Sequence, residues 1–298
     1  MNLKLSWSIF LCSLLFLCSF SSEEHGKKLE SSSSLLWKIE GTGVHKDCYL
    51  FGTMHMIQKD RFYFPTALQK KIRKSQLVIS EVDLDDLDDQ MKLMPYLTLQ
   101  EGNVLDFFTE KQQDTLLNWA KEEFFLDKEA FLASMGKMKP FVLLQLTTQM
   151  SMVGKVESYE MSIAKICKEE KIETLGLEGL EEQIGFLDAL SKEQQAEMVI
   201  EAIRDGDKAV EMLRDLQDMY LRQEMDSLYL IAKNEGGTMG SLEQVFLAQR
   251  NHNWIPKIKA WIAEKSCFIA VGAGHLGGEE GVINLLRKEG YRLTPVKI

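Results

Sequence analysis

The chain of 298 residues has little of several features that mark common protein classes. Its 35 Lys and Arg residues are outnumbered by 45 Asp and Glu residues, which gives a formal net charge of −10. Binding of nucleic acid requires Lys and Arg patches for the phosphates, so this balance argues against a nucleic-acid partner. The five cysteines show neither the spacing of a zinc site nor that of a disulfide framework. Cys167 and Cys267 lie in apolar patterns, which indicates buried thiols.

Long apolar runs are also scarce, since only the N-terminal run Leu5–Phe20 is prominent. It follows Lys4 and ends in the small-x-small pattern Ser19-Phe20-Ser21, so residues 1–21 are predicted to be a secretory signal peptide. We therefore expect a secreted or periplasmic protein, whose link to a membrane would be an N-terminal anchor. Lipid modification of Cys18, which would make a cell-envelope lipoprotein, is the less favoured alternative because bulky residues precede it.

The remaining chain predicts an α/β fold with a central mixed sheet. Residues 22–34 are polar and serine-rich, which is typical of a flexible tether. Residues 35–298 are predicted to form one domain with a large helical insertion at about 84–151 and 180–264. Capping-box patterns open helices after Thr109 and Ser191. Strands are expected at 35–40 (an edge strand), 48–51, 77–83, 172–177, 267–272 and 291–296.

Two segments from opposite ends of the chain share one pattern, an apolar strand followed by Gly-x-x-His. Tyr49–Phe51 leads into Gly52-Thr53-Met54-His55, and Cys267–Val271 leads into Gly272-Ala273-Gly274-His275. In an open α/β sheet, ligands bind outside the carboxyl ends of the strands. We therefore expect His55 and His275 to reach one crevice.

The second segment also matches a dinucleotide-binding fingerprint, Gly272-x-Gly274-x-x-Gly277, but its surroundings exclude that interpretation. The acidic residue expected about 20 positions later would fall at the end of the chain. Glu279 and Glu280 stand at the following helix start, where their charge would oppose a pyrophosphate.

Carboxylates follow two other predicted strands, since Glu81 and Asp83 end one and Glu178 follows the next. Together with His55 and His275, either Glu81 or Glu178 would complete a His/His/Glu set for a divalent Mn, Co or Zn ion. Such an ion keeps an open position for water, and a spare carboxylate can accept the proton of that water. The competing interpretation is a pair of histidines satisfied by backbone groups at strand ends, and spacing leaves both open.

A polar cluster at Arg250-Asn251-His252-Asn253-Trp254 is expected between two helices, 242–250 and 254–264. Arg250 and Asn251 could orient a substrate carbonyl or an anion. The alternative is a helix junction capped by Asn251. The chain has no Gly-x-Ser-x-Gly and no His-Glu-x-x-His, which argues against a serine hydrolase and an ordinary zincin.

Taken together, these segments resemble the TraB/GumN family, which includes the pheromone-shutdown proteins and the Wnt-cleaving Tiki proteins. The resemblance implies a fold similar to the erythromycin-esterase and ChaN-like group. It further implies a site for a divalent metal and peptide hydrolysis at His55, His275 and Glu81 or Glu178, while Arg250 and Asn251 match the family's Arg-Asn pair by position. The segments that carry the resemblance are Phe51–His55, Ser80–Asp83, Leu175–Glu178 with Glu181–Gln183, Arg250-Asn251 with Trp254, and Val271–Leu276 with Gly281. Gly179 departs from the family's Leu-Glu-Thr.

The predicted function is that of an exported metal-dependent hydrolase, a peptidase acting on a peptide or protein substrate. The alternative is a non-catalytic binding protein of the cell envelope for a peptide or a haem-like ligand. The helical insertion motivates this alternative, because its methionines and aromatic residues could shape an apolar groove.

Overall fold

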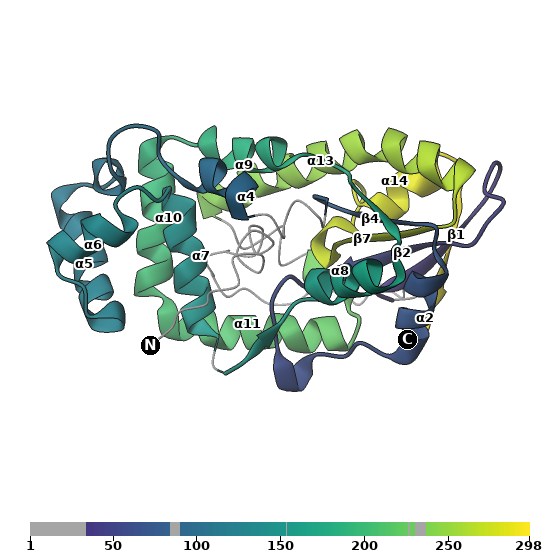
Figure 1. Ribbon diagram of the computed structural model, residues 1–298, viewed down its shortest axis with the longest axis horizontal. Helices are drawn as coiled ribbons and strands as arrows, with labels where there is room; N and C mark the ends of the chain where they lie inside the picture. Colours follow the sequence, from purple (N-terminus) through teal and green to yellow (C-terminus); the bar gives the residue numbers. More distant parts are fainter. Residues whose placement is uncertain (1–33, 84–89, 153, 226, 230–236) are drawn as a thin grey trace. The chain divides into compact units, whose positions relative to one another are not determined.

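The computed structural model describes residues 34–83, 90–152, 154–225, 227–229 and 237–298 (Figure 1). These form two compact units, one from residues 90–152 and 180–213 and the other from the remaining described residues. The predicted signal peptide lies outside the described residues, as does the predicted tether apart from Ser34. Within the described part of the chain, no helix is both long and apolar enough to cross a membrane.

The second unit is organised around a six-stranded sheet with the strand order β6-β4-β7-β2-β1-β8. Strands β6, β4, β7 and β2 run parallel, whereas β1 is antiparallel to both β2 and β8. The predicted α/β fold with a mixed sheet is therefore confirmed, and its strands come from both ends and the middle of the chain. The strands are β1 (Leu36–Glu40), β2 (Cys48–Thr53), β4 (Leu77–Ser80), β6 (Glu173–Gly176), β7 (Cys267–Gly272) and β8 (Arg292–Val296), and a separate small sheet joins β3 (Ile57–Gln58) to β5 (Val156–Glu157).

The prediction that residues 35–40 form an edge strand is wrong, because β8 pairs with the outer side of β1. Leu36 and Ile39 are fully buried in this position. The strand at this edge of the sheet is β8, which contains Pro295 opposite Trp37. Proline lacks the N–H that an interior strand must donate, so it is found in strands that lie at an edge.

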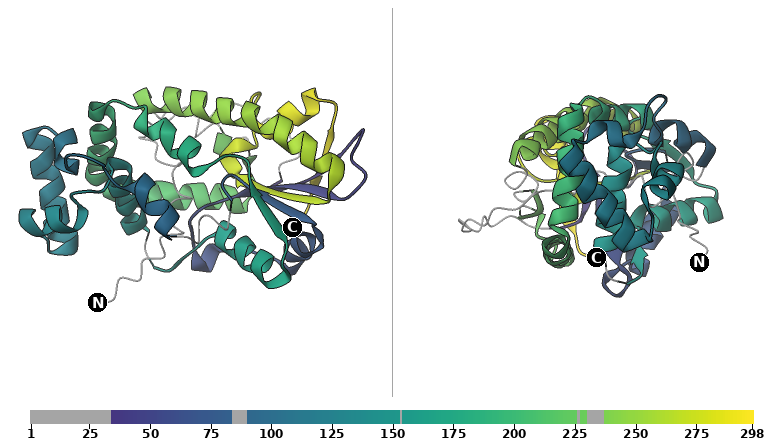
Figure 2. Two further views of the ribbon diagram at one scale, coloured as in Figure 1. Left: turned by 45° about the horizontal axis from the view of Figure 1, so that its top comes forward. Right: turned by 90° about the vertical axis from the view of Figure 1, so that its left-hand side faces the viewer.

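Helices cover both faces of this sheet (Figures 1 and 2). Helices α2 (Thr66–Lys74) and α8 (Tyr159–Glu170) pack together on one face, and α13 (Gly237–Glu264) and α14 (Val282–Lys288) lie on the other. Ser158 caps α8, since its hydroxyl accepts a hydrogen bond from the Met161 N–H. Both faces of the parallel strands are therefore shielded, which is the usual state of a parallel sheet.

The predicted helix junction at Arg250–Trp254 is wrong, because α13 runs through these residues without a break. Asn251 is not a cap, since its side chain bonds groups outside the helix. The alternation of buried Arg250, Asn251 and Trp254 with exposed His252 and Asn253 is that of a helix with one face packed against the sheet.

The first unit is a cluster of helices around its own apolar core. Helix α10 packs against α7 and α5. Both predicted capping boxes are present, at Thr109 and at Ser191. Its helices are α4 (Gln90–Leu97), α5 (Glu110–Phe124), α6 (Lys128–Met135), α7 (Pro140–Ser151), α9 (Leu180–Asp188) and α10 (Lys192–Arg204), and α11 (Gly206–Leu221) follows in sequence. The core includes Leu105, Leu116, Phe131, Leu143 and Val199.

Candidate functional site

Polar side chains follow the carboxyl ends of four parallel strands in the second unit. His55 follows β2 by two residues, Glu81 comes directly after β4, and Glu178 follows β6 by two residues. His275 closes a short 3₁₀ turn, η3 (Ala273–His275), after β7. Because the carboxyl ends of parallel strands lie on the same side of the sheet, side chains that are far apart in sequence meet there.

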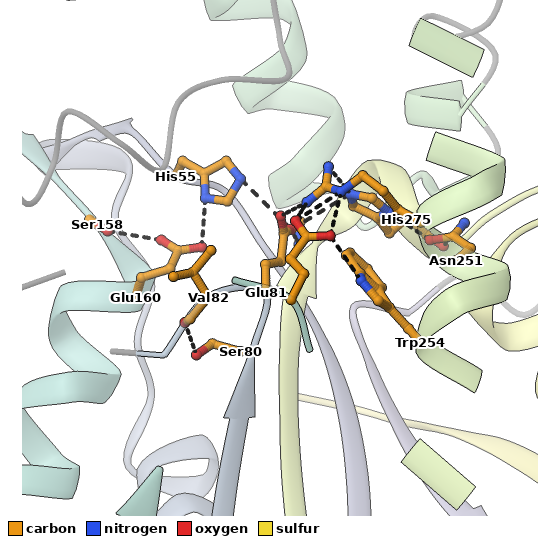
Figure 3. A network of polar contacts seen from close by, with 12 residues as sticks. His55, Ser80, Glu81, Val82, Ser158, Glu160, Asn251, Trp254 and His275 are labelled. Carbon is orange, nitrogen blue, oxygen red and sulfur yellow. Dashed lines mark hydrogen bonds and ion pairs between the residues drawn. The ribbon is translucent and has the colours of Figure 1, made fainter. Parts of the chain in front are cut away.

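The two imidazoles lie on either side of the Glu81 carboxylate (Figure 3). Nε2 of His55 is 3.9 Å from Oε1 of Glu81, and Nε2 of His275 is 3.7 Å from the same oxygen. The Gly272 N–H donates a hydrogen bond of 2.7 Å to that oxygen. The exposed fractions of His55, Glu81 and His275 are 6%, 6% and 1%. One buried carboxylate oxygen is thus the meeting point of both Gly-x-x-His segments.

Gly272 is required at this point by the close approach of the site residues. A Cβ at position 272 would lie 3.1 Å from Oε1 of Glu81 and 3.4 Å from Nε2 of His55. Any larger residue would therefore crowd the carboxylate and the imidazole, and Glu81 would have to move by a few tenths of an ångström. The glycine of this segment makes room for the site as well as for the turn.

Arg250 holds two carboxylates of the site together. Its Nη2 donates to Oε2 of Glu81 at 2.6 Å and to Oε1 of Glu178 at 2.5 Å, and its Nε lies 3.0 Å from both oxygens of Glu178. Arg250 is 1% exposed. A guanidinium in such a position needs charged partners, because an unpaired buried charge is costly.

The two carboxylates differ in acidity although they share Arg250. Burial by itself would raise the pKa of Glu81, but the charges of His275, Arg250 and His55 and the Gly272 N–H lower this pKa to about 2. Burial also raises the pKa of Glu178, and the neighbouring charge of Glu81 adds to the rise, while Arg250 only partly opposes it. Glu178 is therefore the carboxylate that accepts a proton more readily.

His275 is fixed by Asn251. Nδ1 of His275 lies 2.6 Å from Oδ1 of Asn251, and the Asn251 amide donates to the backbone carbonyls of His275 and Glu280. This orientation of the amide makes Nδ1 the protonated nitrogen, so the lone pair of His275 is on Nε2. Burial lowers the pKa of His275 to about 3. The ring is therefore neutral at pH 7 and presents Nε2 to Glu81 and to Nη1 of Arg250, which is 3.3 Å away.

His55 has a corresponding partner that the sequence did not reveal, the carboxylate of Glu160. Oε1 of Glu160 lies 2.9 Å from Nδ1 of His55, and Ser158 donates a hydrogen bond of 2.8 Å to Oε2 of Glu160 (Figure 3). Burial raises the pKa of Glu160, but the charge and hydrogen bond of His55 and the hydroxyl of Thr53 lower it below its usual range. A neutral imidazole that donates from Nδ1 keeps its lone pair on Nε2.

Trp254 completes the site from the next turn of α13. Its indole N–H donates to Oε2 of Glu178 at 3.2 Å, and its ring lies 4.4 Å from that of His275. Asp83, the other carboxylate after β4, accepts a hydrogen bond from Thr174 instead. All six residues proposed from the sequence, namely His55, Glu81, Glu178, Arg250, Asn251 and His275, lie in one network with Glu160 and Trp254.

Charges of both signs meet in the site, since Arg250 and the charge of His55 face the carboxylates of Glu81 and Glu160. Glu81 and Glu160 are ionised at pH 7 because their pKa values are lowered, and Arg250 balances one of them. His275 is neutral at this pH. In its neutral form each imidazole offers an Nε2 lone pair, and together with a carboxylate oxygen these are donors suited to a divalent transition metal. Within the described residues, no three His, Cys, Asp or Glu side chains already stand at metal-binding spacing.

Comparison with known proteins places the chain in a family. Residues 35–295 match the TraB/PrgY/gumN family. The chain belongs to this family. It is 24% identical over 245 residues to a protein of Shigella flexneri called "Uncharacterized protein YbaP", covering 82% of this chain and 89% of that protein. The protein of the same name from Escherichia coli K12 is also 24% identical, over 241 residues that cover 80% and 87% of the two chains. No solved structure matches the chain significantly.

Proposed function

We propose that the chain is an exported, metal-dependent hydrolase that cleaves peptide bonds in a peptide or protein substrate. The observation that supports this most is the placement of two Nε2 atoms, from His55 and His275, around one oxygen of Glu81. Family membership is consistent with the proposal but does not establish an activity, because one fold can serve many functions. The export part of the proposal depends on the predicted signal peptide at residues 1–21.

The residues of the site fit a divalent first-row cation in chemistry, and two of their separations are close to those between metal ligands. Two ligands of a tetrahedral zinc ion stand about 3.4 Å apart, given metal–ligand distances of about 2.1 Å. The Nε2–Oε1 separations of 3.7 and 3.9 Å exceed this by a few tenths of an ångström. His55, His275 and Glu81 would hold the ion, with Glu178 as the further candidate ligand.

The partners of the two imidazoles match those of metal ligands in other proteins. A ligating histidine usually donates its other ring N–H to a carboxylate or a carbonyl oxygen, which fixes both tautomer and orientation. Glu160 has this position at His55, and the amide oxygen of Asn251 has it at His275. A partner at Nδ1 thus fixes the orientation of each ring, so that Nε2 points to Glu81.

The proposed catalytic roles follow from the charges of the chain's own residues. When bound, a divalent ion supplies an acidified water and polarises a carbonyl oxygen. Glu178 is assigned the general base, because its pKa is raised and its carboxylate can take and return a proton. Arg250 keeps Glu178 and Glu81 beside each other, and the indole N–H of Trp254 holds Oε2 of Glu178 in place.

Metal analysis and peptide cleavage together test the proposal. Purified chain should retain Mn, Co or Zn, and His55→Ala and His275→Ala should each lose it along with metal-dependent cleavage of a peptide library. His252→Ala is the matched control, since His252 is exposed on α13 and pairs with Glu280. Glu178→Gln should keep the metal and lose turnover. Equal metal content in the wild type and both site variants would refute the metal site, while metal retention without any cleavage would favour the binding-protein alternative.

A further inference from the structure

Cys48 and Cys267 come from opposite ends of the chain but lie next to each other in the sheet. Each is the first residue of its strand, β2 for Cys48 and β7 for Cys267. These strands run parallel, and their register pairs Tyr49 with Phe268. One residue earlier, Cys48 and Cys267 are therefore level with each other, with their side chains on the same face.

The contacts of the two sulfur atoms confirm that they share one small space. Sγ of Cys48 lies 3.4 Å from the carbonyl oxygen of Lys265, and Sγ of Cys267 lies 3.5 Å from the same oxygen. Both cysteines are fully buried and both are free thiols. The interaction between the two thiols lowers the pKa of Cys48 and raises that of Cys267.

The backbone spacing at this point suits a disulfide bond. Neighbouring strands are about 4.8 Å apart, and disulfides join Cα atoms that are roughly 4.4 to 6.8 Å apart. Cys167, the remaining described cysteine, lies on α8 and not in the sheet. The wide separation of Cys48 and Cys267 in sequence hides this pair, because a parallel pairing joins residues that no local pattern connects.

We propose that Cys48 and Cys267 form an intramolecular disulfide when the chain folds in the presence of a small-molecule disulfide such as glutathione disulfide. The thiolate of one cysteine attacks a sulfur of glutathione disulfide and releases one glutathione thiolate. The second cysteine then attacks the protein sulfur of this mixed disulfide and releases another. Two cysteine S–H bonds are lost, one S–S bond forms, and two molecules of glutathione carry away the protons and electrons.

The bond would secure the two strands that carry the histidines of the site. Strand β2 leads to His55 and β7 leads to His275, and the cysteines stand at the opposite ends of the same strands. A cross-link here closes a loop that contains most of the chain, and such long loops gain the most from closure in the chain-entropy account. Because both thiols are buried in the folded chain, the exchange takes place while the strands are still open.

Oxidative refolding of the full chain tests this proposal without reference to metal or activity. The chain is unfolded and reduced, refolded with a mixture of reduced and oxidised glutathione, and treated with N-ethylmaleimide before digestion and mass spectrometry. We expect a Cys48–Cys267 linked peptide pair that is two hydrogens lighter than its reduced parts, and an alkylated Cys167. The urea midpoint of unfolding should be higher for this oxidised chain than after treatment with dithiothreitol.

Variants show which cysteines pair, and the result for the wild-type chain decides whether the proposal stands. Cys167→Ser should still form the linked pair, whereas Cys48→Ser should leave Cys267 alkylated. The proposal is overturned if the refolded wild-type chain, with native circular dichroism, carries the alkyl label on both Cys48 and Cys267. It is overturned equally if either of them is found bonded to another cysteine of the chain or to glutathione instead.

Discussion

Replacement of Arg250 by methionine should destabilise the metal-free chain by about 3–5 kcal/mol. Methionine keeps much of the length and the apolar stem, but it removes the charge that Glu81 and Glu178 face at 2.6 and 2.5 Å. Removing one partner of a buried ion pair costs about this amount, because the other charge stays in the interior without compensation. Here two carboxylates lose the same partner, so we expect the upper part of the range.

The cost of Arg250→Met should be read from urea unfolding at pH 7 in the presence of a chelator. Arg292→Met is the matched control, since Arg292 also pairs with a glutamate, Glu40, at 2.9 Å, but its side chain is 74% exposed. An exposed pair of this kind contributes about 1 kcal/mol or less. The comparison therefore separates the effect of burial from that of losing an arginine.

A second substitution tests whether the loss arises from the carboxylates. Glu178→Gln in the Arg250→Met background removes one of the two carboxylate charges that have lost their partner. The free energy of unfolding of the double variant should therefore exceed the value expected from adding the two single effects by at least about 1 kcal/mol. If Arg250→Met costs no more than Arg292→Met, or if the two site substitutions simply add, the account of Arg250 as the charge partner of the site fails.

Three further predictions concern the neighbours of Arg250. The contribution of neutral His275 to the free energy of unfolding of the metal-free chain should be complete above pH 6.5 and should fall as the pH drops toward 3, because the pKa of His275 is lowered to about 3 in the folded state. By pH 5 the loss is about 2 kcal/mol. His275→Gln should reduce this difference in urea titrations at pH 7 and pH 5. Glu160→Gln should weaken metal binding about 10- to 100-fold in competition with a chromophoric chelator, whereas Glu157→Gln, a half-buried neighbour, should not. Gly272→Ala should weaken metal binding, because its Cβ would crowd both Oε1 of Glu81 and Nε2 of His55, and native-like metal affinity would contradict this.

Local signals in the sequence were sufficient for much of the sheet and for part of the site. The apolar runs before Gly52 and Gly272 are short and end in glycine, and both form strands that deliver a histidine. The capping pattern at Ser191 is also a local property, since Gln194 returns a hydrogen bond to the cap residue within one turn. Signals of this kind act between residues that are adjacent in the chain.

Non-local pairing accounts for what the sequence did not reveal. Glu160 is one more acidic residue at a helix start, where the dipole favours it, and only the folded chain shows that it is buried against His55. The position of β1 inside the sheet depends on its pairing with β8, more than two hundred residues away. Arg250 and Asn251 looked like a junction because polar residues interrupt the apolar pattern, yet buried partners from other strands satisfy them within a continuous helix.

The burial of this site links its function to the stability of the second unit. Strand ends in an α/β sheet normally present polar groups to water, but here Glu81, Glu178 and Arg250 are each no more than 6% exposed. Burying these charges is unfavourable by itself. Contacts with charged partners outweigh this cost for Glu81, whose pKa is lowered, but not for Glu178, whose pKa is raised. The charge of Glu178 is therefore less favourable in the folded chain than in water. A divalent ion of the kind proposed above, binding only the folded chain, would add its binding free energy to stability. Beside Glu178 it would also offset the cost of burying that carboxylate, so metal binding and the stability of this unit are expected to change together.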